Sequence, residues 1–242
     1  KRRLLSSDLA SFVLMNGFPS AYRVRTPIIY HVWAQDEGAS ITIMERLKSL
    51  PVQAMSGGQI RDGLRNVQRL GFHVVHRDIK PANMGVDNDG SIVLFDFDLA
   101  RMHRFAKIEK DPARAATGYQ VDLAGSTLYM SDARLSHYPP CPLDDVVSFL
   151  ISMWELNYPE TWKQLMANDM DRMEDDAIMK LRRGYIQESA PMIQTAIGIL
   201  EAQPNDATGT PSCNPPRPSC SCTTVLVPKL LGPACAMCAC GG

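Results

Sequence analysis

The sequence predicts an α+β fold in which a few short strands are followed mainly by helices. Apolar residues make up 45% and charged residues 21% of the 242 residues, values typical of a folded chain. Up to residue 203 the apolar residues recur with strand or helix spacing. From Pro204 onward Pro, Ser, Thr, Gly and Cys dominate, which is typical of a flexible tail. We therefore expect a folded unit over residues 1–203 and a tail over 204–242.

Charge and hydropathy argue against two classes of partner. The net charge of −1 offers no overall attraction for nucleic acid or an anionic membrane. The longest apolar stretches, such as 146–154, fall well short of the ~20 residues that span a bilayer, and no signal peptide is visible. We therefore expect neither nucleic acid nor a membrane as a partner, and the oligomeric state stays open.

The first part of the chain combines helix and strand. Asp8–Met15 is predicted to be a short helix that ends at Asn16-Gly17. Residues 28–34 and 40–44 are rich in β-branched and aromatic side chains, and the polar residues 35–38 separate them. This pattern predicts a β-hairpin.

A longer helix is predicted over residues 59–70. Its apolar residues recur in steps of four, three and three, which places them on one helix face: Ile60, Leu64, Val67 and Leu70. Gly71 is expected to end this helix.

The remaining elements follow from short apolar runs and from helical spacing. Strands are expected at 72–75 and 91–95 around a polar loop, with a turn at 87–90, whereas 97–125 shows no clear period. Helices are predicted over three later ranges: 144–158, 161–186 and 191–202.

Four polar side chains between residues 78 and 96 suit phosphoryl transfer. Asp78, Lys80 and Asn83 share one loop, and Asp96 follows 13 residues after Asn83 across a turn. Asn83 and Asp96 offer oxygen atoms, the ligands that Mg²⁺ prefers. Lys80 can neutralise a transferring phosphoryl group, and Asp78 can accept the proton of an attacking hydroxyl. The residue types in this order predict a phosphate-and-Mg²⁺ site.

The same stretch resembles the protein kinase family. Residues 76–83 are similar to its H-R-D-x-K-P-x-N catalytic loop, and residues 96–98 to its D-F-G turn. The resemblance implies a protein-kinase-like fold with a mainly helical C-lobe and a partial N-lobe. It implies Asp78 as the base, Lys80 on the γ-phosphate of ATP, and Asn83 and Asp96 on Mg²⁺. The position of the Lys is that of Ser/Thr kinases, so a protein substrate with a Ser or Thr acceptor is expected.

Two later segments extend the resemblance. Gly125–Ser131 is similar to the G-T-x-x-Y-x-S segment that closes the activation loop, with Ser126 in place of Thr. Asp145–Ser148 is similar to the D-x-x-S opening of the central C-lobe helix, which implies that Asp145 holds the catalytic-loop backbone. The pair Asp144-Asp145, with His137 upstream and no clear A-P-E, resembles the casein kinase I branch. Acids at a plain helix N-terminus are the alternative explanation.

Residues 41–47 are similar to the last N-lobe strand and the hinge of the family. The resemblance implies Met44 as the gatekeeper, with backbone groups of Glu45 to Leu47 offered to adenine. It divides the folded unit into a partial N-lobe and hinge over 1–47 and a C-lobe over 48–203.

The N-terminal part departs from the family pattern. Neither G-x-G-x-x-G nor V-A-I-K is present, and Asp8 stands where the family's αC helix carries Glu. Either the sequence is a fragment of a complete kinase, which the absent initiator Met favours, or the protein is a degenerate relative. In both cases this chain alone is expected to bind ATP poorly and to be inactive. Asp98 in place of Gly is expected to stiffen the D-F-G turn.

Arg77 and a basic run later in the sequence have two interpretations each. Arg77 either binds a phosphorylated residue of the activation segment or pairs with a nearby acidic side chain. The basic run has two interpretations: it recognises acidic or prephosphorylated substrates, or it is simply a solvated loop. It consists of Arg101, Arg104, Lys107, Lys110 and Arg114. The acidic residues between 169 and 176 are expected to form an exposed helix face.

The Cys-rich tail has ligand-like spacings in Cys220-x-Cys222 and Cys235-x-x-Cys238-x-Cys240. Zn²⁺ binding, disulfides and S-acylation are possible uses of such cysteines. The tail has no His and no flanking core, which favours a disordered tail or sequence translated outside the natural frame.

Three functions stay open at this stage. The first is a Ser/Thr protein kinase, and the second is a pseudokinase scaffold that binds a protein partner without catalysis. The third is a small-molecule phosphotransferase of the same fold, which Lys80-Pro81 and the Gly125-Ser126 segment disfavour. The sequence upstream of Lys1 would separate the first two. An intracellular location, cytoplasmic or nuclear, is expected.

Overall fold

The computed structural model of the chain describes residues 23–34, 40–52, 55–71, 74–102, 124–136 and 140–201. The contacts and absences reported below concern these residues. The architecture is mixed helix and strand with helix predominating, as the α+β prediction requires.

A β-hairpin opens the described part. β1 (Ile29–Ala34) pairs antiparallel with β2 (Ser40–Met44), which confirms the predicted hairpin. Its predicted turn at 35–38 lies outside the described residues. Beyond the strands, the Glu45 N–H donates to the Ile28 carbonyl at 2.7 Å, which continues the pairing.

Backbone contacts on both sides join this hairpin to the rest of the molecule. Ahead of β1, the Arg25 carbonyl accepts a hydrogen bond from the Leu94 N–H at 3.1 Å. The buried Asn66 side chain accepts from the Arg25 N–H at 2.6 Å and donates to its carbonyl at 3.0 Å. After β2, Lys48 and Val86 exchange two backbone hydrogen bonds of 2.9 Å.

α2 (Gly57–Leu70) confirms the helix predicted from apolar spacing. Ser56 and Gln59 form a capping box at its start, and Leu64, Val67 and Leu70 are buried. Gly71 ends the helix with φ of −58°, so a left-handed cap is not the reason for glycine there. A Cβ on Gly71 would lie 2.8 Å from the Cβ of Pro142, so close packing against Pro142 explains the glycine at this position.

Two short strand pairs follow α2. β3 (Val74–Val75) pairs with β6 (Arg101–Met102), a pairing that the sequence did not predict. β4 (Met84–Val86) and β5 (Ile92–Leu94) form a hairpin around the predicted turn at 87–90, in which Gly90 has φ of 81°.

The rest of the described chain is helical. The elements are η2 (Pro81–Asn83), η3 (Thr127–Tyr129), α5 (Asp132–Leu135), α6 (Pro142–Asn157), α7 (Pro159–Met166), η4 (Met170–Arg172), α8 (Asp175–Ser189) and α9 (Pro191–Glu201). α6 and α9 confirm two predicted helices. The single helix predicted over 161–186 is wrong, because the chain leaves the helix after Met166 and restarts at Asp175. The Asn168 side chain donates to the carbonyls of Gln164 and Leu165 at the end of α7, which replaces continuing helical bonds.

The acidic residues near 169–176 lie around this break and not along one helix face. Asp175 and Asp176 occupy the first turn of α8, where carboxylates interact favourably with the helix dipole. Glu174 precedes them as the N-terminal cap position.

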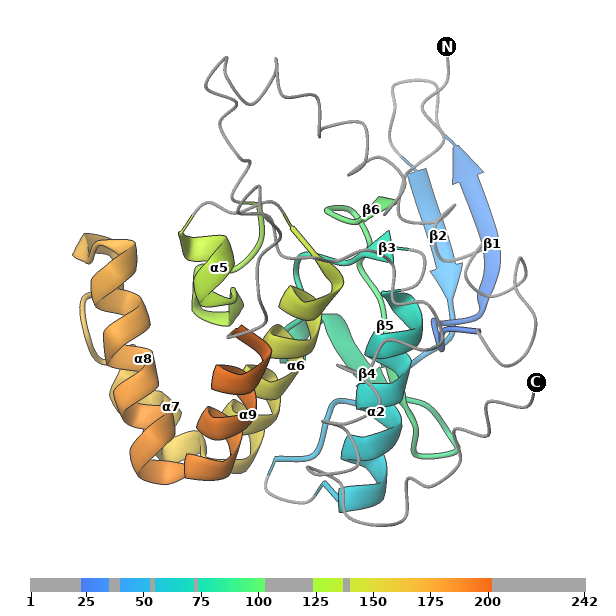
Figure 1. The fold of residues 1–242 in the computed structure, drawn as a ribbon. Helices are drawn as coiled ribbons and strands as arrows, with labels where there is room; N and C mark the ends of the chain where they lie inside the picture. Colours follow the sequence, from blue (N-terminus) through green and yellow to red (C-terminus); the bar gives the residue numbers. More distant parts are fainter. Residues whose placement is uncertain are drawn as a thin grey trace, which may run out of the picture.

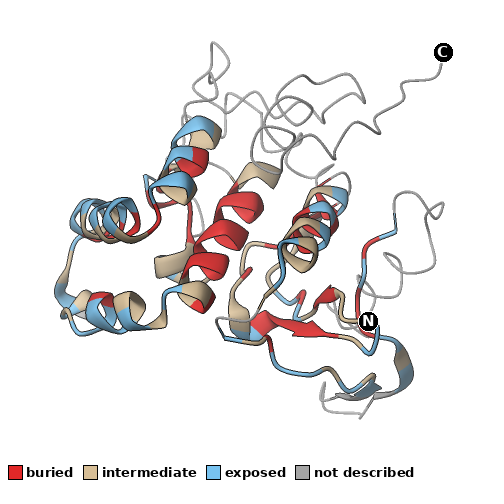
Figure 2. Ribbon diagram, turned by 90° about the horizontal axis from the view of Figure 1, so that it is seen from below, coloured by how far each residue is buried: buried red, intermediate tan, exposed pale blue. Residues whose placement is uncertain are grey.

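α6 is the centre of the core, and most of its side chains are buried (Figure 2). On one side Phe149 and Met153 pack with α2 and β5, and on the other Ile151 and Trp154 pack with the later helices (Figure 1). Because α6 lies between the two clusters, its polar side chains need internal partners. No helix of the described part is long and apolar enough to cross a membrane.

Candidate functional site

The loop after β3 is fixed by one buried carboxylate of α6. Asp145 accepts hydrogen bonds from the backbone N–H groups of His76 at 2.6 Å and Arg77 at 2.9 Å. Burial raises the pKa of Asp145 to about 7, although both backbone hydrogen bonds act to lower it. Arg77 has φ of 74°, a strained conformation for a residue with a side chain. The two bonds to Asp145 stabilise this strained turn, which directs the next residue, Asp78.

Asp78 is the point where four donors converge. Its Oδ1 accepts from the Ser126 N–H at 3.0 Å and the Ser126 hydroxyl at 2.9 Å. Its Oδ2 accepts from Asn83 Nδ2 at 2.8 Å and pairs with Lys80 Nζ at 2.8 Å. Lys80 Nζ also donates to Ser126 Oγ at 2.8 Å. The structure therefore brings together four sequence-predicted residues that lie up to 48 positions apart.

These donors determine the protonation state of Asp78. Burial acts to raise the pKa of Asp78, but the hydrogen bonds from Lys80, Ser126 and Asn83 outweigh it and hold the pKa below its usual value. Asp78 is therefore ionised at neutral pH.

Gly125 allows the segment with Ser126 to reach the loop. It has φ of 120°, and a Cβ there would overlap the Arg77 carbonyl oxygen. Only glycine meets both requirements without strain.

Asn83 and Asp96, the expected Mg²⁺ ligands, lie on neighbouring strand ends. The Phe95 N–H donates to the Asn83 carbonyl at 3.1 Å, next to Asp96 in the chain. Both hydrogens of Asn83 Nδ2 are used by Asp78, on its carbonyl and on Oδ2, so Asn83 Oδ1 is the atom that can meet a cation. Asp96 is exposed with φ of 62°. Within the described ranges no three His, Cys, Asp or Glu side chains form a metal-binding group, so a Mg²⁺ ion here would need further oxygen ligands.

Asp98, which stands in place of the Gly of D-F-G, does not adopt a positive φ. Arg77 and Asp96 are the non-glycine residues with positive φ in the described part, so Asp98 stands in a conformation that any residue adopts. Whether Asp98 stiffens the turn stays a prediction.

His76 lies beneath the loop. It is fully buried, its Nε2 is 3.0 Å from the Phe95 carbonyl, and its ring centroid is 4.7 Å from that of Phe97. Burial lowers the pKa of His76 against the raising effects of the Phe95 carbonyl and the carboxylates of Asp78 and Asp96. His76 is therefore a neutral packing residue that joins the loop to residues 95–97.

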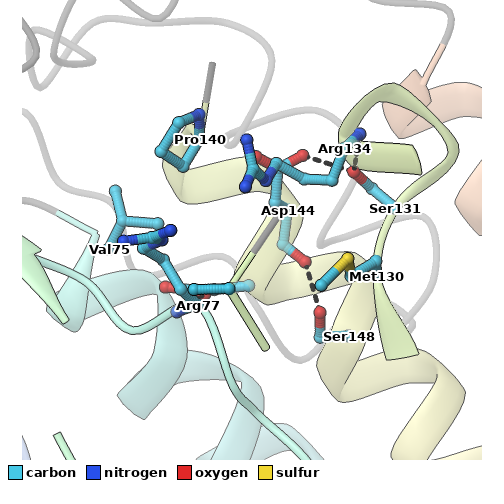
Figure 3. A pocket seen from close by; sticks show the side chains of 10 residues that line it. Val75, Arg77, Met130, Ser131, Arg134, Pro140, Asp144 and Ser148 are labelled. Atoms are coloured by element: carbon cyan, nitrogen blue, oxygen red, sulfur yellow. Dashed lines mark hydrogen bonds between the residues drawn. The ribbon is translucent and has the colours of Figure 1, made fainter. Parts of the chain in front are cut away.

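Arg77 reaches into a pocket between this loop and the start of α6 (Figure 3). Arg134, Ser131 and Asp144 also line the pocket, and Arg77 Nη1 is 3.4 Å from the Leu99 carbonyl. Arg77 thus has local backbone contacts. A phosphorylated partner of Arg77 is expected at Thr117, Tyr119 or Thr127, of which the first two lie outside the described residues and Thr127 is exposed in η3.

The expected hinge residues Met44, Glu45 and Leu47 lie apart from this network, on the hairpin side. Met44 is 43% exposed and ends β2. Leu47 packs onto Gly85 of β4, where a Cβ would lie 2.6 Å from Leu47 Cβ. The absence of a side chain at Gly85 therefore lets the segment after β2 lie directly on β4.

Several sequence-based expectations fall outside the described residues. They concern the helix at 8–15 with Asp8, His137, the basic residues from Arg104 to Arg114, and the Cys-rich tail.

Sequence reasoning missed a set of buried polar residues behind the site. Arg182 of α8 is 2% exposed and donates to the carbonyls of Leu128 at 3.0 Å and Met130 at 2.6 Å. It also donates to Asp132 at 2.6 Å. Burial lowers the pKa of Arg182, which Asp132 and Glu201 counteract. In the sequence Arg182 is one of several charged residues of an ordinary helix, so no local signal marks it.

No protein-family model matches the chain. Part of it is similar to curated Ser/Thr protein kinases. It is 34% identical over 109 residues to the chloroplastic serine/threonine-protein kinase STN8 of Arabidopsis thaliana, which is 45% of this chain and 21% of that protein. It is 32% identical over 91 residues to receptor-interacting serine/threonine-protein kinase 1 of Homo sapiens, which is 36% of this chain and 14% of that protein.

A bacterial relative gives the same result. The chain is 30% identical over 117 residues to the serine/threonine-protein kinase PknL of Mycobacterium tuberculosis, 47% of this chain and 27% of that protein. The chain thus spans less than a third of the length of these relatives. At low identity and over part of the chain, these similarities support a protein kinase family and a phosphotransferase of the Ser/Thr type. They do not single out the casein kinase I branch.

Proposed function

We propose that this protein is a Ser/Thr protein kinase of protein-kinase-like fold. It transfers the γ-phosphoryl group of ATP to Ser or Thr hydroxyls of a protein substrate. The observation that carries the proposal is the convergence of Lys80, Asn83 and Ser126 on the Asp78 carboxylate. The similarity of the chain to Ser/Thr protein kinases supports the same reading.

The residues fit a Mg²⁺–ATP complex. Asn83 Oδ1 and the exposed Asp96 carboxylate would hold Mg²⁺, an ion that prefers oxygen ligands. The Glu45 N–H is bound to Ile28, whereas the backbone groups of Leu47 make no hydrogen bond to another described residue and suit the edge of adenine. Met44, the last residue of β2, precedes them in the chain.

Asp78 and Lys80 would perform the protein's part of the chemistry. When bound, Mg²⁺–ATP supplies the phosphoryl group and neutralises part of its charge. The ionised Asp78 orients the acceptor hydroxyl and accepts its proton as the new O–P bond forms and the bond to ADP breaks. Lys80, 26% exposed, lies beside Asp78 and Ser126 and offers a positive charge to the transferring group.

The finer assignments belong to the same proposal. The pair Asp144-Asp145 supports kinship with the casein kinase I branch. An intracellular location, cytoplasmic or nuclear, follows from the resemblance to protein kinases. We assign Ser126 to holding Asp78 and Arg77 to shaping the loop, on the contacts described above.

The test is phosphoryl transfer by the full-length protein expressed from its own gene. It is incubated with labelled ATP, Mg²⁺ and three acceptors: Ser/Thr peptides, matched Tyr peptides and small alcohols. Label is expected on Ser and Thr, with a loss of more than about 100-fold in Asp96→Asn. Asp98→Asn, which changes the neighbouring exposed carboxylate, is the matched control and should keep most activity.

Other outcomes would overturn the proposal. Label on small alcohols alone would make the protein a small-molecule phosphotransferase. No label on any acceptor, with the fold intact, would leave the pseudokinase scaffold.

A further inference from the structure

Two consecutive carboxylates at the start of α6 hold two different segments. Asp145 binds the backbone of the loop that carries Asp78, as described above. Asp144 accepts from the Ser131 hydroxyl at 2.5 Å (Figure 3). It also accepts from the Cys141 N–H at 2.6 Å. Ser131 is 1% and Asp144 7% exposed, so water does not compete for this bond.

Ser131 ends the short segment that begins at Ser126. Within it, the N–H groups of Tyr129 and Met130 donate to the carbonyls of Ser126 and Thr127, which forms η3. Side chains bind its next carbonyls, because Arg182 donates to those of Leu128 and Met130 and Ser148 donates to that of Tyr129 at 2.7 Å. These bonds keep the segment in one conformation, so the place of Ser131 helps to fix the place of Ser126.

The far end of the segment meets the site. The Ser126 N–H and hydroxyl both donate to Asp78 Oδ1, and Lys80 Nζ donates to Ser126 Oγ. One turn of α6 thus carries the supports of both partners, Asp145 for the Asp78 side and Asp144 for the Ser126 side.

We propose that Asp144, acting through Ser131, is a positioning residue that sets Ser126 against Asp78 and Lys80. The proposal rests on the proposed kinase function for its effect on catalysis. Its geometric part stands on the hydrogen bonds alone. Supporting residues must hold the reacting groups of a site to within a fraction of an ångström. The short hydrogen bond from Ser131 to Asp144 of the central helix α6 suits this role.

The experiment compares Ser131→Ala with Ser152→Ala. Ser152 is a fully buried serine of α6 whose hydroxyl donates to the Ser148 carbonyl at 2.8 Å, and none of its described hydrogen bonds goes to residues 126–131. The first readout is amide hydrogen exchange at the Ser126 N–H in the 242-residue chain. We expect exchange to be about 10-fold faster in Ser131→Ala and unchanged in Ser152→Ala and in Ser131→Thr, which keeps the hydroxyl.

The second readout is kinetic and uses the full-length protein. We expect kcat to fall about 10-fold in Ser131→Ala with little change in KM for ATP, because the hinge residues are not displaced. Ser131→Thr should restore kcat. If the wild-type protein transfers no phosphoryl group, the proposed function fails, while the exchange readout still decides the positioning role.

A second variant separates this role from helix capping. Ser131 Oγ also accepts from the Arg134 N–H at 3.1 Å, so Ser131→Ala removes a cap of α5 as well. In an Asp144→Asn background, where the pair is already altered, the effect of Ser131→Ala on Ser126 exchange should shrink. The proposal would be overturned if the effects of Ser131→Ala and Asp144→Asn on Ser126 exchange added in full. Equal effects of Ser131→Ala and Ser152→Ala on this exchange would also overturn it.

Discussion

The site around α6 and the β1–β2 hairpin are held in different ways. In the site, side chains link residues distant in sequence, as Asp145 does with His76 and Ser126 with Asp78. The hairpin is joined to the body through the backbone of Arg25 and Lys48 and the side chain of Asn66. It also leaves large apolar side chains exposed: Ile28, Tyr30, Ile43 and Met44.

In the proposed reaction, the acceptor hydroxyl is activated in the first region and adenine is bound near the second. The two regions are expected to differ in rigidity. The loop that carries Asp78 is fixed by two hydrogen bonds from its backbone to the buried Asp145 of α6. The backbone groups of Leu47 proposed for adenine lie just after β2, beside Lys48, whose backbone pairs with Val86. Regions with few buried contacts open at lower free energy, so variants of the two regions should differ in stability and in local opening.

The largest stability effect is expected for Arg182→Met. The variant leaves the carbonyls of Leu128 and Met130 without their donor in a buried site, and Asp132 loses one of its two guanidinium partners. We expect a loss of about 3–5 kcal/mol in the free energy of unfolding, measured with urea. Lys163→Met removes the exposed pair with Glu160 and should cost less than about 1 kcal/mol. Equal losses would show that the buried cluster carries no special stability.

Asp145→Ala should follow in size. It leaves the N–H groups of His76 and Arg77 buried without an acceptor, at a cost of about 2–4 kcal/mol. Asp145→Asn keeps one acceptor oxygen and should lose roughly half as much. Hydrogen exchange should rise at residues 76–80 and stay unchanged in the hairpin; a uniform rise would contradict the division into two regions.

Asn66→Ala tests the hairpin's attachment. The variant removes both side-chain bonds to the Arg25 backbone, for an expected loss of about 1–3 kcal/mol. Exchange should rise first at residues 29–34 and 40–44, while the Ser126 N–H stays protected. Unchanged hairpin exchange would mean that the remaining backbone bonds, from Leu94 to Arg25 and between Lys48 and Val86, are enough to hold this region.

The smallest effect concerns pH and His76. Its pKa is lowered in the folded state, so below about pH 6.5 the unfolded chain binds a proton that the folded chain does not. The stability contributed by a neutral His76 is present above that pH and is lost as the pH falls, by at most about 1.4 kcal/mol per pH unit. The measurement is the difference in unfolding free energy between wild type and His76→Gln at pH 7.5 and pH 5.5, about one unit either side of that value. A difference that does not change with pH would contradict a buried neutral His76.

Local patterns were sufficient to predict several elements. The spacing of Ile60, Leu64, Val67 and Leu70 predicts α2, because a helix buries one face. The polar residues at 87–90 predict the turn between β4 and β5. The order of Asp78, Lys80, Asn83 and Asp96 predicts the candidate site, and the structure brings the first three together with Ser126.

Tertiary contacts explain what sequence reasoning missed. The pairing of β3 with β6 involves strands of two residues each, too short for a periodic pattern. The break between α7 and α8 depends on Asn168, a residue that also occurs inside helices. The roles of Ser131 and Arg182 depend on which helix lies opposite, and nothing in their sequence neighbourhood specifies that.

The most direct test of the central claim is the rate of phosphoryl transfer in Asp78→Asn. Asparagine keeps the size and one acceptor oxygen but cannot take up the hydroxyl proton. The full-length variant should fold as the wild type does and lose about 10²–10⁴-fold in kcat on a Ser/Thr peptide. Folded Asp78→Asn protein with wild-type kcat would contradict the account, because the convergence of Lys80, Asn83 and Ser126 on this carboxylate would then have no part in the reaction.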